Sequence, residues 1–246
     1  MKEHREDSYT VRSYDVDIRR RLRLSCMMDY FQESAWRHAE ELGVGVQRLG
    51  EEGCFWVLSR LCVEVERYPV WNEQVTLRTW PKGIDRLFAL RDFLLFDEAG
   101  ETCARASTAW LILHGERRRP VRVEPFFQHL LSPTAAEALP GTPEKIDPLT
   151  EDVSAGCRRS GYAVLDMNRH VNNARYADWV LDSFPLERFD REGVRKFSIQ
   201  YLAEIGPETE VDLRSSSPEE GVCLLSGRSG STEHFRSRVV WSSSIR

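Results

Sequence analysis

Residues 71–79, WNEQVTLRT, decide the fold, because the chain repeats them in altered form at residues 207–215 as PETEVDLRS. A second and looser pair follows in the same order, GETCARASTAW at 100–110 and GSTEHFRSRVVW at 230–241. A repeat has to be recognised first, since overlooking one gives the wrong fold. The sequence therefore predicts one structural unit present twice.

The first unit combines a helix with several strands. Residues 27–42 carry apolar side chains at helical spacing, and Gly43 follows as a stop signal. This stripe consists of Met27, Tyr30, Phe31, Ala35 and Leu42. Alternating runs typical of strands follow at residues 57–65, 75–80, 87–96 and 104–113. Val57, Leu61, Val63 and Val65 are expected on one face of the first run, and residues 97–101, DEAGE, predict a hairpin turn.

The second unit repeats this order. A helical stripe at Tyr176, Trp179, Val180 and Phe184 precedes strand-like runs at 195–201, 210–214, 222–226 and 235–241. Each unit is predicted to be a long helix against an antiparallel sheet, an α+β fold, and merging the two sheets would remove exposed edges. The proline-containing stretch 126–150 predicts a linker. We therefore expect an N-terminal domain at 1–125, a linker at 126–150 and a C-terminal domain at 151–246.

Composition excludes several classes of protein. The chain has 246 residues and a formal net charge of −5, which argues against general nucleic-acid binding. No run of 18 apolar residues exists, so no membrane insertion is expected, and the polar N-terminus favours a cytoplasmic protein. The six cysteines are scattered without a CxxC pair, so neither a disulfide framework nor a zinc site is predicted.

The strongest chemical signal is the stretch at 166–173, DMNRHVNN, directly before the second predicted helix. In an extended chain, Asp166, Asn168, His170 and Asn172 would share one face. Helix capping accounts for Asn172 or Asn173 but not for the other three. A carboxylate, an amide and an imidazole in this arrangement can orient a water and polarise a carbonyl. The first unit has LRLSCMMDYFQES in the matching place, so only the second unit is expected to be catalytic.

On these motifs the chain resembles the acyl-acyl-carrier-protein thioesterases, a family with tandem hotdog domains. The likeness covers about residues 10 to 241 and lies in three kinds of segment: the 166–173 strip with its helix, the first-unit strands, and IQYLAEIGPETEV at 199–211. The resemblance implies hydrolysis of fatty acyl-acyl carrier protein to a free fatty acid, without a metal or organic cofactor. It implies Asp166, Asn168, His170 and Glu204 as catalytic residues.

One position departs from the family pattern. Plant members often carry a cysteine after the matching glutamate, whereas this chain has Ile205. An aliphatic side chain cannot attack a thioester, so direct attack by water is expected. Glu204, with or without His170, would activate the water, while Asn168 and amides of the helix N-terminus would polarise the carbonyl and Asp166 would fix their geometry.

The resemblance further places the acyl chain in the N-terminal domain. Apolar candidates for its slot are Met27, Phe31 and Trp56. Since the carrier protein is acidic, the runs Arg19–Arg21 and Arg117–Arg119 are candidate docking residues.

Three other functions stay open at this point. An acyl-CoA thioesterase would use the same chemistry on another carrier, and a non-catalytic acyl-binding hotdog protein would use only the fold. A hotdog enoyl hydratase is disfavoured, because those enzymes have a proline and one more residue between the Asn and the His. Monomer and homodimer are both compatible with the sequence.

Overall fold

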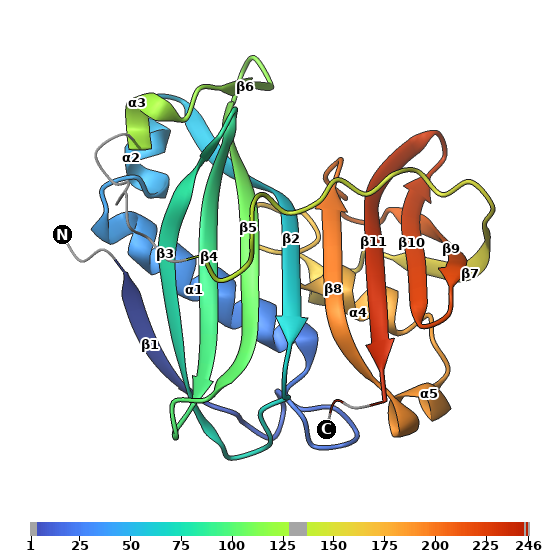
Figure 1. Ribbon diagram of the computed structural model, residues 1–246. Coiled ribbons are helices and arrows are strands. Elements are labelled where there is room, and N and C mark those ends of the chain that lie inside the picture. The colour runs from blue at the N-terminus through green and yellow to red at the C-terminus, as the bar shows by residue number, and fades with distance from the viewer. Residues whose placement is uncertain (1–3, 128–136, 244, 246) are drawn as a thin grey trace.

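Each copy of the repeat forms half of one antiparallel sheet in the computed structural model of the protein, which describes residues 4–127, 137–243 and 245 (Figure 1). The first half contains β1 (Arg5–Thr10), β2 (Cys54–Val65), β3 (Gln74–Asp85), β4 (Phe88–Asp97), β5 (Thr102–His114) and the short β6 (Arg119–Val121). The second half contains β7 (Val153–Arg159), β8 (Gly193–Tyr201), β9 (Glu210–Glu219), β10 (Val222–Ser229) and β11 (Thr232–Ser242).

The strand order displays the repeat directly. Apart from β6, which pairs with β5, the order is β1-β3-β4-β5-β2-β8-β11-β10-β9-β7. Reading inward from either edge, β1, β3, β4, β5 and β2 match β7, β9, β10, β11 and β8. The quoted repeats WNEQVTLRT and PETEVDLRS supply the starts of the matching strands β3 and β9. The two halves join where β2 pairs antiparallel with β8, so the predicted merging of sheets is confirmed.

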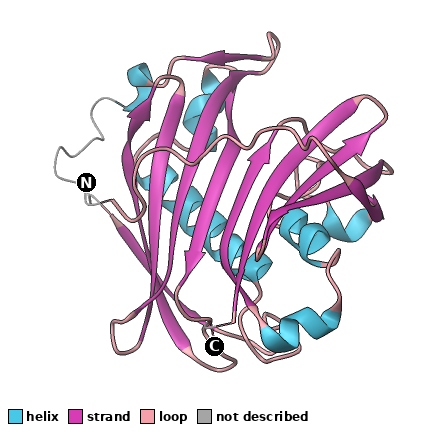
Figure 2. Cartoon of the chain, turned by 45° about the vertical axis from the view of Figure 1, so that its right-hand side comes forward, coloured by secondary structure: helices cyan, strands magenta, loops and turns pink. Residues whose placement is uncertain are grey.

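The helices α1 and α4 lie against the same face of the sheet (Figure 2). The helices are α1 (Leu24–Glu41), α2 (Val46–Glu51), α3 (Glu124–Phe127), α4 (Arg175–Leu181) and α5 (Leu186–Arg191), with a 3-10 turn at Tyr162–Val164. α1 confirms the first predicted helix, and Gly43 beyond its end has a φ of +71° that glycine adopts readily. The predicted α+β class is thus confirmed, although the second half has a helix of only seven residues instead of a long one.

The larger of two hydrophobic clusters in the described residues runs under both halves, and the smaller lies in the first half. In the first half the ring of Phe31 on α1 stacks on Phe93 of β4, with centroids 4.9 Å apart. In the second half Tyr176 on α4 meets Phe235 of β11 edge to face at 5.2 Å. Gly227 on β10 leaves room for that Phe235 ring, since a Cβ there would lie 2.2 Å from it.

One predicted strand face is wrong. The pairing of β2 with β5 shifts register between Leu58 and Arg60, which is a β-bulge. A bulge inserts an extra residue and breaks the alternation of side chains. Leu58 and Leu61 consequently face the same cavity beside α1, and Val57 does not share the face of Leu61.

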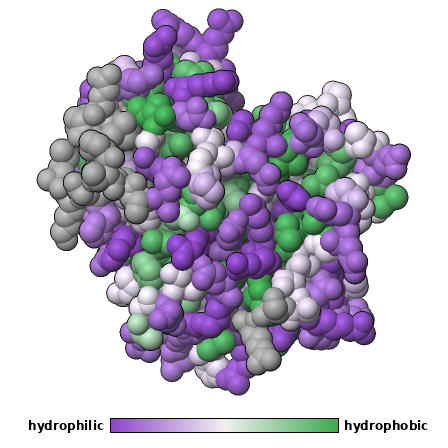
Figure 3. Space-filling model, in the orientation of Figure 1, coloured by the Kyte–Doolittle hydropathy of each residue, from purple (hydrophilic) through white to green (hydrophobic). Residues whose placement is uncertain are grey.

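The segment predicted as a linker crosses the other face of the sheet, drawn in yellow in Figure 1. Its residues 128–136 lie outside the described part of the chain. After them, Lys82 donates to the carbonyl of Gly141 at 2.7 Å, and the N–H of Ile146 donates to Gln200 Oε1 at 3.0 Å. Figure 3 shows this face, on which hydrophobic residues appear in small groups between hydrophilic ones. No helix in the described part of the chain is long and apolar enough to cross a membrane.

Candidate active site at the end of β8

Residues 166–173 form a tight turn instead of the extended strand that their alternation predicts. The N–H of Asp166 donates to the carbonyl of His170 at 2.8 Å, and Arg169 adopts a left-handed φ of +64°. The Asp166 carboxylate causes this shape, because its Oδ1 accepts the backbone N–H groups of Asn168 at 2.8 Å and His170 at 3.2 Å. The prediction that alternate polar side chains share one face is therefore wrong, since the aspartate folds the segment back on itself.

The helix after the turn starts later than predicted. Asn172 Oδ1 accepts the N–H of Ala174 at 2.9 Å, and α4 begins at Arg175 instead of about Asn173. Asn172 therefore closes the turn before the helix. The sequence predicted that backbone amides at the helix N-terminus would polarise the carbonyl. The geometry does not support this role, because Asn172 already binds one of these amides and α4 has only seven residues.

Three contacts tie the turn and the start of α4 to the end of β8 and the segment that follows it. The N–H of Val171 donates to the carbonyl of Ile205 at 2.9 Å. Tyr201, at the end of β8, donates its hydroxyl to the carbonyl of Asn173 at 2.8 Å. The buried hydroxyl of Tyr176 bonds the backbone of Ile205, and burial raises the pKa of this tyrosine. These contacts fix the neighbouring Glu204 beside the turn.

Glu204 and His170 consequently face each other across 34 residues of sequence. The His170 Nε2 lies 3.6 Å from Glu204 Oε2, and the two side chains are 36% and 35% exposed. Arg118, from the turn between β5 and β6, places its Nη2 3.2 Å from the same oxygen. A carboxylate, an imidazole and a guanidinium from three separate segments thus meet at a site that water can reach.

The four residues implied by the resemblance take different positions. His170 and Glu204 come together, while the Asp166 carboxylate points back to the amides of its own turn. Asn168 lies exposed at the tip of that turn. The contact of Arg118 with Glu204 was missed from the sequence, which assigned this arginine only to carrier docking. No local signal announces it, because 86 residues separate the two.

A small cavity lies between α1, the first-half strands and the start of α4. Its volume is about 20 Å³, room for roughly one water. The lining comprises Met28, Phe31, Gln32, Leu58, Leu61, Phe93, Thr108, Trp110, Asn173 and Ala174. Of the three slot candidates, only Phe31 contributes. Met27 belongs to the fully buried core, and Trp56 packs in a second cluster with its indole N–H on the carbonyl of Val44.

The residue after Glu204 cannot act as a nucleophile. Ile205 is completely buried. All six cysteines are free thiols, and only Cys157 is exposed. Burial raises the pKa of Cys103 to about 11, which keeps that thiol protonated at neutral pH.

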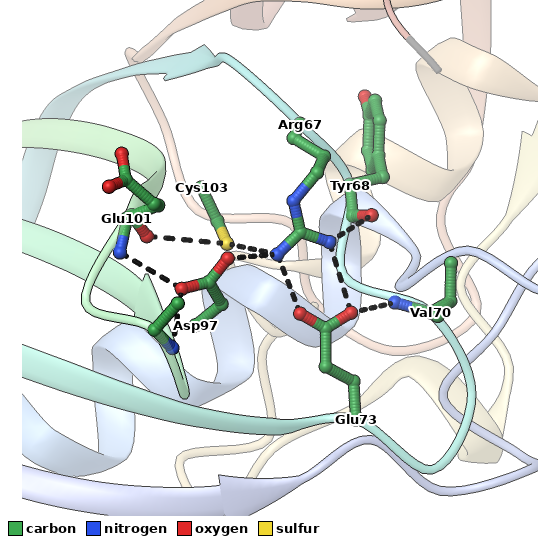
Figure 4. A network of polar contacts seen from close by, with 8 residues as sticks. Arg67, Tyr68, Val70, Glu73, Asp97, Glu101 and Cys103 are labelled. Atoms are coloured by element: carbon green, nitrogen blue, oxygen red, sulfur yellow. Dashed lines mark hydrogen bonds and ion pairs between the residues drawn. The ribbon is translucent and has the colours of Figure 1, made fainter.

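Glu73, Asp97 and Cys103 are a group of possible metal ligands within the described residues. Figure 4 shows that Arg67 occupies the space between them. Its guanidinium lies 2.6 Å from a Glu73 oxygen, 2.8 Å from Asp97 and 3.2 Å from the Cys103 sulfur. This cation bridges both carboxylates, so the group is an ion-pair network that links the segments around the strand ends.

The two arginine runs proposed for docking differ in their surroundings. Arg21 is 5% exposed, pairs with Asp17 at 3.0 Å and lies over the ring of Tyr68. Arg21 is therefore unavailable to a partner, and the docking prediction is wrong for this residue, whereas Arg19 and Arg20 are exposed and stay candidates. Arg117 and Arg119 are exposed on the turn that also carries Arg118.

Family models match both halves of the chain. The model described as acyl-ACP thioesterase N-terminal domain matches residues 2–130, and the acyl-ACP thioesterase C-terminal domain matches residues 158–242. These boundaries leave out much of the segment that crosses the sheet.

Comparison with individual proteins finds acyl-carrier-protein thioesterases as well. A chloroplastic palmitoyl-acyl carrier protein thioesterase of Arabidopsis thaliana is 27% identical over 96% of this chain, and oleoyl-acyl carrier protein thioesterase 2 of the same plant is 30% identical over 92%. The matches cover 63% and 67% of those relatives, so the chain spans about two thirds of their length. The crystal structure of an acyl-ACP thioesterase from Bacteroides thetaiotaomicron is 25% identical, with a TM-score of 0.89 and 98% of both chains covered.

Proposed function

Since the chain belongs to the acyl-ACP thioesterase family, we propose that it hydrolyses the thioester of fatty acyl-acyl carrier protein and releases the free fatty acid. One observation carries this proposal. The carboxylate of Glu204 and the imidazole of His170 lie 3.6 Å apart, half-exposed, although they come from different segments. A positioned carboxylate and imidazole are the groups that general-base activation of water requires.

The proposed reaction is direct attack by water. Glu204, assisted by His170, accepts a proton as the water oxygen bonds to the thioester carbonyl carbon. The carbon–sulfur bond then breaks, the sulfur leaves with a proton as the carrier's thiol, and the acyl group leaves as the acid. The Asn168 amide is assigned to the carbonyl oxygen, and Asp166 positions the turn that carries Asn168 and His170. The buried Ile205 supports a mechanism without a cysteine nucleophile at that position.

The acyl chain is assigned to the first half and the chemistry to the second. In support, the cavity between α1 and the first-half strands reaches Asn173 and Ala174, at the end of the turn that carries His170. At about 20 Å³ it has to widen before it admits an alkyl chain, and flexible lining residues such as Met28 and Gln32 can change rotamer to allow this.

Docking of an acidic carrier is assigned to Arg117 and Arg119. Both are exposed beside the site, where a local positive field steers an acidic partner despite the net charge of −5. Reversing both charges is expected to raise the KM for the carrier-bound substrate at low salt and to leave kcat unchanged. An unchanged KM would remove this assignment. We also propose that the protein acts in the cytoplasm.

The decisive experiment compares three single variants with the wild type on acyl-carrier-protein substrate. Glu204→Gln and His170→Ala are expected to lower kcat by about 10²- to 10⁴-fold, the usual contribution of a general base. Glu208→Gln is the matched control, because Glu208 is an exposed carboxylate four residues further on. Wild-type rates in either active-site variant would refute the catalytic assignment and favour an acyl-binding protein.

The choice of carrier needs its own measurement. The same acyl group is presented on acyl carrier protein and on coenzyme A. A higher kcat/KM on the protein carrier is expected, since the docking arginines then contribute. A higher value on coenzyme A would make the chain an acyl-CoA thioesterase.

A further inference from the structure

Arg118 reaches from the first half of the molecule to the candidate base of the second half. Its Nη2 lies 3.2 Å from Glu204 Oε2, the same oxygen that His170 Nε2 approaches at 3.6 Å. Two nitrogens therefore lie against one carboxylate oxygen, and within the described part of the chain no side chain is bonded to the other oxygen, Oε1.

The turn that carries Arg118 is built to present it. The strand pairing of β5 with β6 closes at His114 and Arg119, and the N–H of Arg118 donates to the carbonyl of His114 at 2.9 Å. Arg118 itself has a left-handed φ of +49°. A residue with a Cβ is uncommon in that region, and such outliers gather at functional sites.

Stability does not explain this contact. The Arg118 side chain is 64% exposed and Glu204 is 35% exposed, and ion pairs this open to water contribute little to folding. The position of the pair is informative instead. A guanidinium has a planar array of N–H donors that fixes the direction of a carboxylate, as a flexible ammonium does not.

We propose that Arg118 is a positioning residue for the hydrolysis, which orients the Glu204 carboxylate so that Oε2 faces His170 and Oε1 faces the attacking water. This inference rests on the proposed function. It also gives the first half a part in the chemistry, because the turn between β5 and β6 completes a site built on the turn before α4 and the end of β8. The rival role, docking of the carrier, makes different kinetic predictions.

The test uses two substrates with the same acyl group, one on acyl carrier protein and one on N-acetylcysteamine, which lacks a carrier. Arg118→Ala is expected to lower kcat about 10- to 100-fold on both, because a small misplacement of a catalytic group has an effect of this size. Arg118→Lys is expected to recover part of the rate. Arg122→Ala removes an exposed arginine just beyond β6 and is expected to stay within about two-fold of wild type on both substrates.

The alternatives give distinct results. An increase in KM confined to the carrier-bound substrate would show that Arg118 docks the carrier and would overturn the inference. If the wild type hydrolyses both substrates and Arg118→Ala has the same kcat and KM as the wild type, the inference is overturned but the proposed function is not. A wild-type protein inactive on both substrates would overturn the proposed function as well.

A double-mutant cycle provides the second measurement. If Arg118 acts through Glu204, Arg118→Ala leaves the residual rate of Glu204→Gln unchanged, because the group that it orients is already gone. Equal losses in the two backgrounds would mean independent action and would refute the inference. Thermal unfolding of Arg118→Ala is expected to match that of the wild type, since the side chain is mostly in solvent.

Discussion

Asp166 shows how one side chain can determine the geometry of a candidate site through hydrogen bonds to its own backbone. Its carboxylate holds two backbone N–H groups and so turns the chain between Asn168 and His170. The sequence predicted a role for this residue, but the alternation of polar side chains indicated an extended segment. A hydrogen bond from a side chain to its own backbone overrides such a pattern, because the turn satisfies amides that a strand would leave unpaired.

Replacing Asp166 tests this role. Asp166→Ala is expected to lower kcat about 10- to 100-fold through displacement of the turn. The free energy of unfolding should fall by about 1–2 kcal/mol, because two amides lose their acceptor. Asp166→Asn retains a carbonyl oxygen as acceptor, so its kcat and its free energy of unfolding are expected to fall less. Steady-state kinetics and denaturant titration measure the effects, and a fully active Asp166→Ala protein would contradict the assignment.

The cysteines permit an independent test of water attack. Cys157 is exposed, while the other five are buried, and burial raises the pKa of Cys26 and Cys62. The thiolate is the reactive form, so iodoacetamide at neutral pH should label Cys157 first in the native protein. Hydrolysis is expected to continue at the unlabelled rate. Mass spectrometry and activity are followed together, and a loss of activity in step with labelling would indicate a cysteine mechanism.

The sequence could predict which residues form the candidate site but not how they meet. Asp166, Asn168 and His170 stand in one short motif, and the resemblance added Glu204. The contact with Arg118 joins residues 86 positions apart, and it depends on how the turn between β5 and β6 closes. Such long-range geometry leaves no periodic trace in the chain.

At the scale of single elements, the sequence predicted the positions of strands better than their irregularities and the lengths of the helices. The runs at 57–65 and 104–113 fall within β2 and β5, and the run at 87–96 lies in β4 except for its first residue. The bulge in β2 and the shortness of α4 were not predictable, because hydrophobic alternation reports an average face and not a local break. The edge strands β1 and β7 were also not predicted, since neither contains a buried residue and so neither shows a hydrophobic face in the sequence.

The Arg67 network illustrates how strand ends are held (Figure 4). Burial raises the pKa of Glu73, but the hydrogen bond and the charge of Arg67, together with the N–H of Val70, outweigh it and keep that pKa below the ordinary value of 4.5. The N–H of Glu101, and after it Arg67, holds the pKa of Asp97 below 3.8. Carboxylates with depressed pKa values stabilise the folded state above their unfolded pKa, and this stability is lost as the pH falls through their folded pKa.

Arg67→Gln should therefore destabilise the protein at neutral pH. We expect a loss of about 1 kcal/mol from the pair with Glu73, discounted because Arg67 is 39% exposed. The difference from wild type should shrink as the pH falls below 4.5, where the unfolded carboxylate of Glu73 takes up its proton. Urea titrations at several pH values measure this. Arg105→Gln, which breaks the exposed pair with Glu66, is the control and should show a smaller effect.

For the whole molecule, the repeat was the most informative feature of the sequence. It predicted two equivalent sheets, and their union follows from the need to cover exposed edges. The route of the linker could not be predicted, because its contacts are individual hydrogen bonds to Lys82, Gln200 and their neighbours. The shared core and the pairing of β2 with β8 suggest that the halves depend on each other for stability.

We therefore expect the two halves to unfold together. Phe235→Leu leaves a gap in the second-half core and should lower stability by about 1–3 kcal/mol. Tryptophan fluorescence reports mainly on the first half, which holds five of the seven tryptophans: Trp36, Trp56, Trp71, Trp80 and Trp110. Its midpoint should shift as far as that of far-UV circular dichroism, because coupled halves share one transition. Leu186→Ala, at a site 65% exposed, should shift neither. If Phe235→Leu leaves the fluorescence midpoint unchanged and makes the circular dichroism curve biphasic, the halves unfold independently.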